Sequence, residues 1–192
     1  MDYSIILAVL SSSLLAAGLT GFINWRLQKQ NYKREYYKKL LDKRIKAYEA
    51  VEGIVEQLYG QVQIEDGRLC PKICASGQEY FWRFVFDLYS SINNSTWLSS
   101  GTGRLLTEFN AFLLQSIDHR IDENADYDSQ LLRIGAEQLE QVRDFREKLK
   151  LLLYQDFRTL HRIDSFVKNK EPSHPGIPLP PKPIHMKKKP SN

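Results

Sequence analysis

Two adjoining stretches decide the fold: YSIILAVLSSSLLAAGLTGFINW (residues 3–25) and RLQKQNYKREYYKKLLDKRIKAYEAVEGIVEQLYG (residues 26–60). The first stretch contains no charged side chain. The second contains no proline and no glycine before Gly53, and it is rich in strong helix formers. We therefore predict one long helix that leaves the apolar stretch and continues without a flexible linker.

The apolar stretch predicts a transmembrane helix at residues 4–25. Its 23 uncharged residues, at about 1.5 Å per residue, can cross a hydrocarbon layer of about 30 Å. Tyr3 and Trp25 stand where interfacial aromatic side chains are common. Two rival interpretations are a cleaved signal peptide and a buried helix of a soluble protein. A signal peptide normally starts with basic residues, which this N-terminus lacks, and a soluble helix is rarely apolar on all faces.

The distribution of lysine and arginine predicts the orientation. None precedes the apolar stretch and nine lie in residues 26–50, here called the basic neck, so the C-terminal side should be cytoplasmic. We expect a single pass through the inner (plasma) membrane, with the N-terminus outside. The residues expected at the membrane interface, against anionic headgroups, are Tyr3, Trp25, Arg26, Lys29, Lys33, Arg34, Lys38 and Lys39. Nucleic-acid binding is the less favoured interpretation of this basic stretch, because the stretch adjoins the apolar segment.

Small side chains recur within the apolar stretch. Ser13, Ala17 and Gly21 are four residues apart, a spacing that lets two membrane helices approach closely. The pattern predicts helix–helix contact, and hence self-association, through this face.

Apolar periodicity beyond the neck predicts an all-α domain at residues 26–165. Steps of three and four residues describe one helix face, close to a coiled-coil heptad seam, in which Arg44 fills a polar gap. This face comprises Tyr37, Leu41, Tyr48, Val51, Val55, Leu58 and Val62. Further helices are predicted at 78–92, 104–122 and 129–163, with 63–77 as a loop, 99–103 as a polar turn and no convincing strand. The predicted fold is a transmembrane helix that continues into a cytoplasmic bundle of about four helices.

Charge divides the chain into three parts. The neck carries a net charge of +6, residues 51–165 carry −6, and residues 166–192 carry +5. The last part is rich in proline and lysine and predicts a disordered tail. Its stretch at 178–183 favours polyproline II, which can dock on an aromatic groove, although a solvated tail is the preferred interpretation.

Several residues are candidates for a metal or ligand site, but their sequence pattern supports none of them. Cys70 and Cys74 supply only two of the four ligands that zinc needs, and they are interpreted as loop thiols. His119 with Asp122 and Glu123 resembles a weak cation site but fits a solvated helix end better, and His161 near Asp164 is judged in the same way. Residues 99–103 lack the lysine of a phosphate-binding loop. No catalytic residue, metal ligand or cofactor is therefore predicted.

A resemblance rests on the segment KREYYKKLLDKRIKAYEAVEGIVEQLY (residues 33–59) behind the apolar stretch. The features that carry it are Lys43-Arg44, Ala47-Tyr48-Glu49 and Trp97-Leu98-Ser99. The chain resembles a loose group of uncharacterised bacterial single-pass membrane proteins. In these, an N-terminal span runs into a basic "KR..AYE" helix and a small helical cytoplasmic domain. The resemblance implies this architecture and supplies no activity.

Two classes of function follow. The first is a non-enzymatic, membrane-anchored adaptor whose bundle binds a protein partner or itself. The alternative is a small membrane-acting effector, of prophage or defence type, that oligomerises through its span and perturbs the bilayer. An enzyme is the least favoured class, because no catalytic constellation is recognised.

Overall fold

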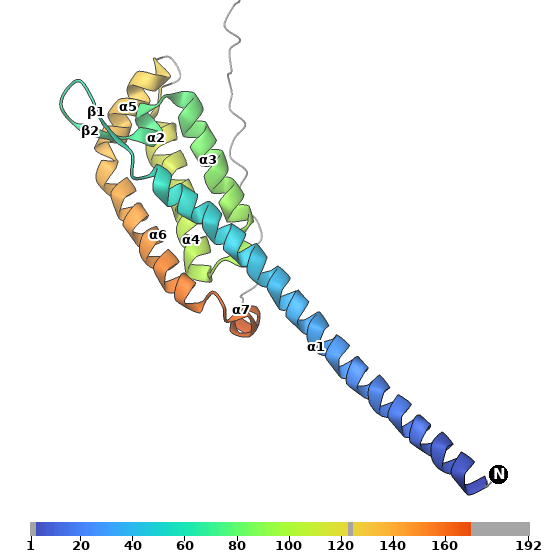
Figure 1. The fold of residues 1–192 in the computed structure, drawn as a ribbon. Coiled ribbons are helices and arrows are strands. Elements are labelled where there is room, and N and C mark those ends of the chain that lie inside the picture. Colours follow the sequence, from blue (N-terminus) through green and yellow to red (C-terminus); the bar gives the residue numbers. More distant parts are fainter. Residues whose placement is uncertain (1–2, 123–124, 170–192) are drawn as a thin grey trace, which may run out of the picture.

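The structure is a computed structural model that describes residues 3–122 and 125–169, and for residues 3–18 and 169 it describes the backbone alone. These residues form seven α-helices and one short β-hairpin, which confirms the all-α class (Figure 1). The elements are α1 (Tyr3–Gln57), β1 (Gln61–Gln63), β2 (Leu69–Pro71), α2 (Lys72–Ala75), α3 (Gln78–Asn93), η1 (Ser95–Trp97), α4 (Ser100–Phe112), η2 (Leu113–Ile117), η3 (Asp118–Arg120), α5 (Tyr127–Glu137), α6 (Leu139–Thr159) and α7 (Ile163–Asn169).

Helix α1 dominates the shape of the molecule. It runs for 55 residues without interruption, as predicted, and at about 1.5 Å per residue it is roughly 80 Å long. Its C-terminal part packs against α3 and α6 within the bundle. Its N-terminal part projects from the bundle alone (Figure 1).

The membrane-spanning part of the prediction is not shown. In the part of the chain that the structure describes, no helix combines the length and the apolar character needed to cross a membrane. The predicted span at 4–25 lies within α1, but the side chains of its residues up to 18 fall outside the described ones.

The core begins where α1 enters the bundle. From α1 it takes Tyr48, Val51 and Val55, and from the turn directly after α1 it takes Leu58; all four belong to the predicted apolar face and all are buried. Val62 was wrongly assigned to that face, since it lies in β1 and is exposed. The other predicted helices supply buried side chains at the expected spacing, among them Phe81, Val85, Leu88 and Ile92 of α3, Leu106 and Phe109 of α4, Leu113 and Ile117 of η2, Leu131 and Ile134 of α5, and Val142, Leu149 and Leu153 of α6.

The loop predicted at 63–77 is partly wrong. Residues 61–63 pair antiparallel with residues 69–71, and α2 follows directly. Gly67 takes a positive φ of 82° at the turn, and the Ile64 N–H donates to the Arg68 carbonyl at 2.9 Å. Three-residue strands are too short to leave a readable alternation in the sequence.

Helix boundaries differ from prediction in three places. The polar turn predicted at 99–103 is instead the N-cap and first turn of α4, and the later part of that helix becomes the π-helical η2 and the 3₁₀ turn η3. The long helix predicted at 129–163 is two helices, which separate at Gln138. Helix α7 extends past the expected domain boundary at 165, and residues 170–192 of the predicted tail lie outside the described residues.

Candidate functional site

A cluster of polar side chains joins α1 to the rest of the bundle, and we call it the junction cluster: Tyr48, Ser99, Thr102 and Asp156. One carboxylate oxygen of Asp156, Oδ2, accepts three O–H donors. They come from Tyr48 at 2.9 Å, Ser99 at 2.7 Å and Thr102 at 2.7 Å. The cluster therefore links the neck helix to the start of α4 and the end of α6.

Ser99 holds its place because it caps α4. Its Oγ accepts the Thr102 backbone N–H at 3.2 Å, the usual N-cap contact, while its own N–H donates to the Tyr48 hydroxyl at 3.0 Å. The Ser99 and Thr102 hydroxyls both donate to Asp156, so neither is presented as a nucleophile. Burial, together with the nearby Asp156 carboxylate, raises the pKa of Tyr48 to about 12. Tyr48 therefore remains a hydrogen-bond donor at physiological pH.

Arg44 lies beside the cluster and is 3% exposed. Its Nη1 donates to the Leu160 carbonyl at 2.8 Å, at the C-terminal end of α6, where a cation is favoured by the helix dipole. Its guanidinium lies 4.0 Å from the centre of the Phe166 ring, so α7 covers it. Its Nε has no hydrogen-bond partner among the described residues. Arg44, the polar residue within the predicted apolar face, thus links both α6 and α7 to the neck.

The segments that carry the resemblance meet at this junction. The Lys43 ammonium lies 4.9 Å from the centre of the Trp97 ring, and Tyr48 contacts Ser99. Residues 43–49 and 97–99 are distant in sequence, and their contact was not predicted. Only the unusual polar position of Arg44 in the apolar face gave a sequence signal for this site.

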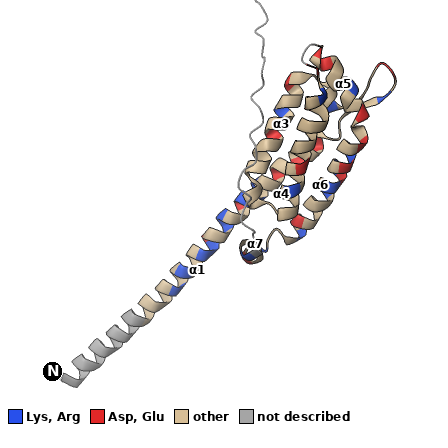
Figure 2. Cartoon of the chain, turned by 180° about the vertical axis from the view of Figure 1, so that it is seen from behind, with Lys and Arg blue, Asp and Glu red and all other residues tan. Residues whose placement is uncertain are grey.

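The predicted membrane-interface residues whose side chains are described form an exposed surface that runs from Trp25 along the neck. Among them Trp25 is 58% exposed, and every basic member is exposed. The Lys29 ammonium lies 5.4 Å from the Trp25 ring centre, and that of Lys33 lies 5.2 Å from the ring of Tyr37. Figure 2 shows the positions of Lys and Arg, in blue, along the projecting part of α1. The side chains of Tyr3, Ser13 and Ala17 lie outside the described residues, and a Cβ at Gly21 would meet nothing within 4 Å.

Exposed apolar side chains lie around the N-terminal end of the neck and just before it. They are Leu19, Phe22, Ile23 and Leu27, and each is about half exposed or more. Such a run on one unpartnered helix is unusual for the surface of a water-soluble domain, where large apolar patches mark interaction sites.

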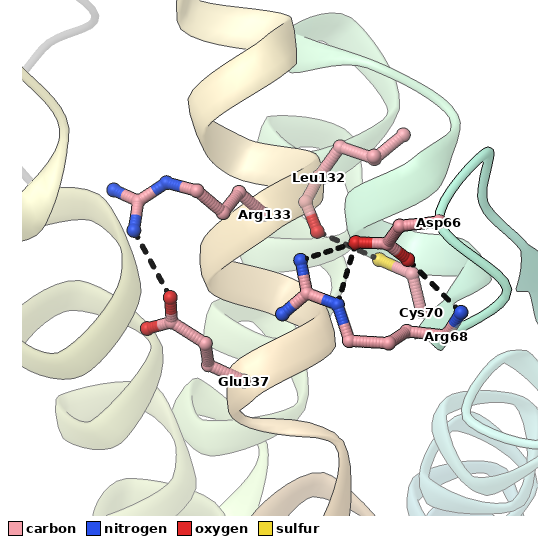
Figure 3. Close-up of polar contacts among 6 residues, drawn as sticks. All are labelled: Asp66, Arg68, Cys70, Leu132, Arg133 and Glu137. Carbon is pink, nitrogen blue, oxygen red and sulfur yellow. Dashed lines mark hydrogen bonds and ion pairs between the residues drawn. The ribbon is translucent and has the colours of Figure 1, made fainter.

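The cysteines are buried, in contrast to the predicted loop thiols. The Cys70 thiol donates to the Leu132 carbonyl at 3.4 Å (Figure 3). A Cβ on Gly135 would lie 2.5 Å from the Cβ of Cys74. Only a glycine at position 135 allows α5 to approach the two cysteines so closely. The ion pairs nearby, Asp66–Arg68 and Arg133–Glu137, are exposed (Figure 3). We assign this end of the bundle to packing.

The other sequence candidates are not brought together. His119 is exposed in η3, and Glu123 lies outside the described residues. Asp164 accepts the Tyr37 hydroxyl. Within residues 3–122 and 125–169, no group of three or more His, Cys, Asp or Glu side chains is arranged to hold a metal. Comparisons of the chain with protein-family models, curated proteins and solved structures found no match.

Proposed function

We propose that the chain is a membrane-anchored adaptor without enzymatic activity. The N-terminal part of α1 lies in the inner membrane and the bundle binds a partner in the cytoplasm. The observation that carries this proposal is the continuity of α1: one helix joins the uncharged residues 3–25, the exposed basic neck and the buried core of the bundle. The exposed apolar side chains next to the neck support the same placement. The resemblance to bacterial single-pass proteins agrees with it.

The junction cluster supports a role in presenting the bundle at a fixed angle. Three hydroxyl donors on one carboxylate, together with the hydrogen bond from Arg44 to Leu160 at the end of α6, oppose bending between α1 and the bundle. A rigid connection between α1 and the bundle is useful to an adaptor because it limits the orientations in which a partner must bind.

The bundle also offers a surface for a partner. Leu151 and Tyr154 on the outer side of α6 are 58% and 65% exposed. Large exposed apolar side chains on one helix face are typical of protein interaction sites. A second copy of the chain is one partner this face can take, since self-association is already predicted for the span.

Two pairs of variants test the proposal. Phe22→Asp with Ile23→Asp should release the full chain from membranes washed at alkaline pH, whereas Tyr32→Asp with Tyr36→Asp, on the same helix beyond the span, should not. Leu151→Ser with Tyr154→Ser should abolish cross-linking to a partner or second copy without changing the thermal unfolding temperature. If the wild-type chain is washed off membranes, or remains monomeric and uncross-linked in them, the proposal is wrong. Expression of wild type with a dye for membrane potential separates the adaptor, which leaves the potential unchanged, from the membrane-acting effector, which collapses it.

A further inference from the structure

A groove lies on the neck side of the bundle, between α1 and the turn that joins α6 to α7. It encloses about 450 Å³ and is lined by Tyr37, Lys38, Leu41 and residues 161–165. The groove brings the basic neck against a segment more than a hundred residues later in the chain. The junction cluster described above does not use it.

The lining combines an apolar floor with a cationic rim. Leu41 is half-buried and Ile163 is buried, while Lys38, His161 and Arg162 are exposed. Lys33 adds a further cation, because its ammonium lies over the ring of Tyr37. Neither Lys38 nor Arg162 forms an ion pair with a carboxylate of the described residues.

One acid, Asp164, also lines the groove. Its carboxylate accepts the hydroxyl of Tyr37, which orients it toward α1. With Lys33, Lys38 and Arg162 present, the rim remains net positive even when His161 is neutral. The groove therefore favours an anionic ligand that also has an apolar part.

We propose that this groove binds the headgroup of an anionic phospholipid, with the phosphate diester between Lys38 and Arg162 and the glycerol and upper acyl chain against Leu41 and Ile163. A free phosphate would use the rim alone and leave the apolar floor in water. This assignment rests on the proposed function, because it requires the neck to lie at a membrane.

The position of the groove adds a geometric consequence. Tyr37 follows Trp25 by twelve residues, or about 18 Å along α1, whereas the headgroup layer is only about 5–8 Å thick. An upright α1 would hold the groove above the lipid. A lean of about 40°, the upper end for membrane helices, lowers Tyr37 only to about 14 Å above Trp25, so bound lipid also requires that the groove lie on the side of α1 that turns toward the membrane.

Native mass spectrometry of the full chain in a maltoside detergent tests the site independently of insertion and tilt. The probes are dihexanoyl phosphatidylglycerol, dihexanoyl phosphatidylcholine and inorganic phosphate. We expect phosphatidylglycerol to bind in preference to both other probes. Lys38→Gln with Arg162→Gln should weaken its binding about tenfold or more, and Lys38→Arg with Arg162→Lys should restore most of it.

The matched control is Lys46→Gln with Arg158→Gln. It removes the same charge from exposed positions on α1 and near the end of α6 that do not line the groove, so binding should change less than about twofold. Equal losses in the two double variants, equal binding of phosphatidylcholine, or full competition by inorganic phosphate would each overturn the lipid site. The proposed function fails separately, by release of the wild-type chain from washed membranes.

Discussion

Tyr48 shows at the level of one residue how the junction depends on protonation. Its pKa is raised from 10.0 to about 12, first by burial and then by the Asp156 carboxylate. Below pH 10 the phenol is protonated in both folded and unfolded chains, so its contribution to stability is fully present. As pH rises from 10 to 12, the unfolded chain gains by ionising, and this contribution is lost.

The first prediction compares wild type with Tyr48→Phe. At pH 8 the wild type should be more stable by about 1–2 kcal/mol, because the variant leaves the Ser99 N–H and the Asp156 carboxylate each short of a partner. This difference should shrink by up to about 2 kcal/mol between pH 10 and 12. Urea unfolding at each pH measures it. Tyr154→Phe is the control, since Tyr154 is exposed, and a constant difference for Tyr48→Phe across this range would contradict the account.

Gly135 gives a second prediction at this scale. A Cβ there would lie 2.9 and 3.0 Å from the sulfurs of Cys74 and Cys70, in addition to its clash with the Cys74 Cβ. Gly135→Ala should therefore destabilise the bundle by about 1–3 kcal/mol or more. Gly53 lies within α1 with nothing within 4 Å of its Cβ position, so Gly53→Ala should stabilise by about 0.5–1 kcal/mol. Thermal unfolding of both variants tests the contrast, and equal shifts would refute it.

At the scale of elements, the sequence predicted helices better than their ends. Phe81, Val85, Leu88 and Ile92 repeat with helical spacing and mark α3 correctly. The division between α5 and α6 was missed because apolar spacing continues from Ile134 to Val142 across the break. The break comes just after Gly135, which packs closely against the two cysteines. Such packing is a tertiary constraint, and the local sequence does not reveal it. The start of α4 was missed because Gly101 and Gly103 suggested a turn, whereas the Ser99 cap is strong enough to begin a helix there.

The division of α1 into a free and a packed part gives a third prediction. Proline at an interior helix position costs about 3 kcal/mol where the helix must stay intact. Glu52→Pro falls where α1 packs in the core and should destabilise the bundle by at least that amount. Gln30→Pro falls on the projecting part and should change bundle stability by less than about 0.5 kcal/mol. Circular dichroism during urea unfolding measures both, and a large loss of bundle stability with Gln30→Pro would show that the neck packs elsewhere.

At the scale of the molecule, the distribution of charge along the chain predicted the arrangement of its parts better than local residue patterns did. The basic side chains of the neck other than Arg44 are exposed along α1, as its composition suggested, and the more acidic part of the chain forms the bundle (Figure 2). The junction cluster could not be predicted, because Tyr48, Ser99 and Asp156 come from three distant segments and no spacing rule relates them. The groove at the α6–α7 turn was missed for the same reason, and because Ile163 and Phe166 fell at the edge of a region taken for a tail.

The central claim is that α1 holds the bundle at the cytoplasmic side of a membrane. Labelling of spheroplasts with a membrane-impermeant maleimide tests it most directly, using Asp2→Cys and Glu65→Cys in separate chains. Glu65 is exposed in the hairpin turn, and Cys70 and Cys74 are buried, so the wild-type chain provides the unlabelled baseline. The account predicts labelling of Asp2→Cys in intact spheroplasts and of Glu65→Cys only after permeabilisation. Labelling of Glu65→Cys in intact spheroplasts, or recovery of the wild-type chain in the soluble fraction, would contradict it.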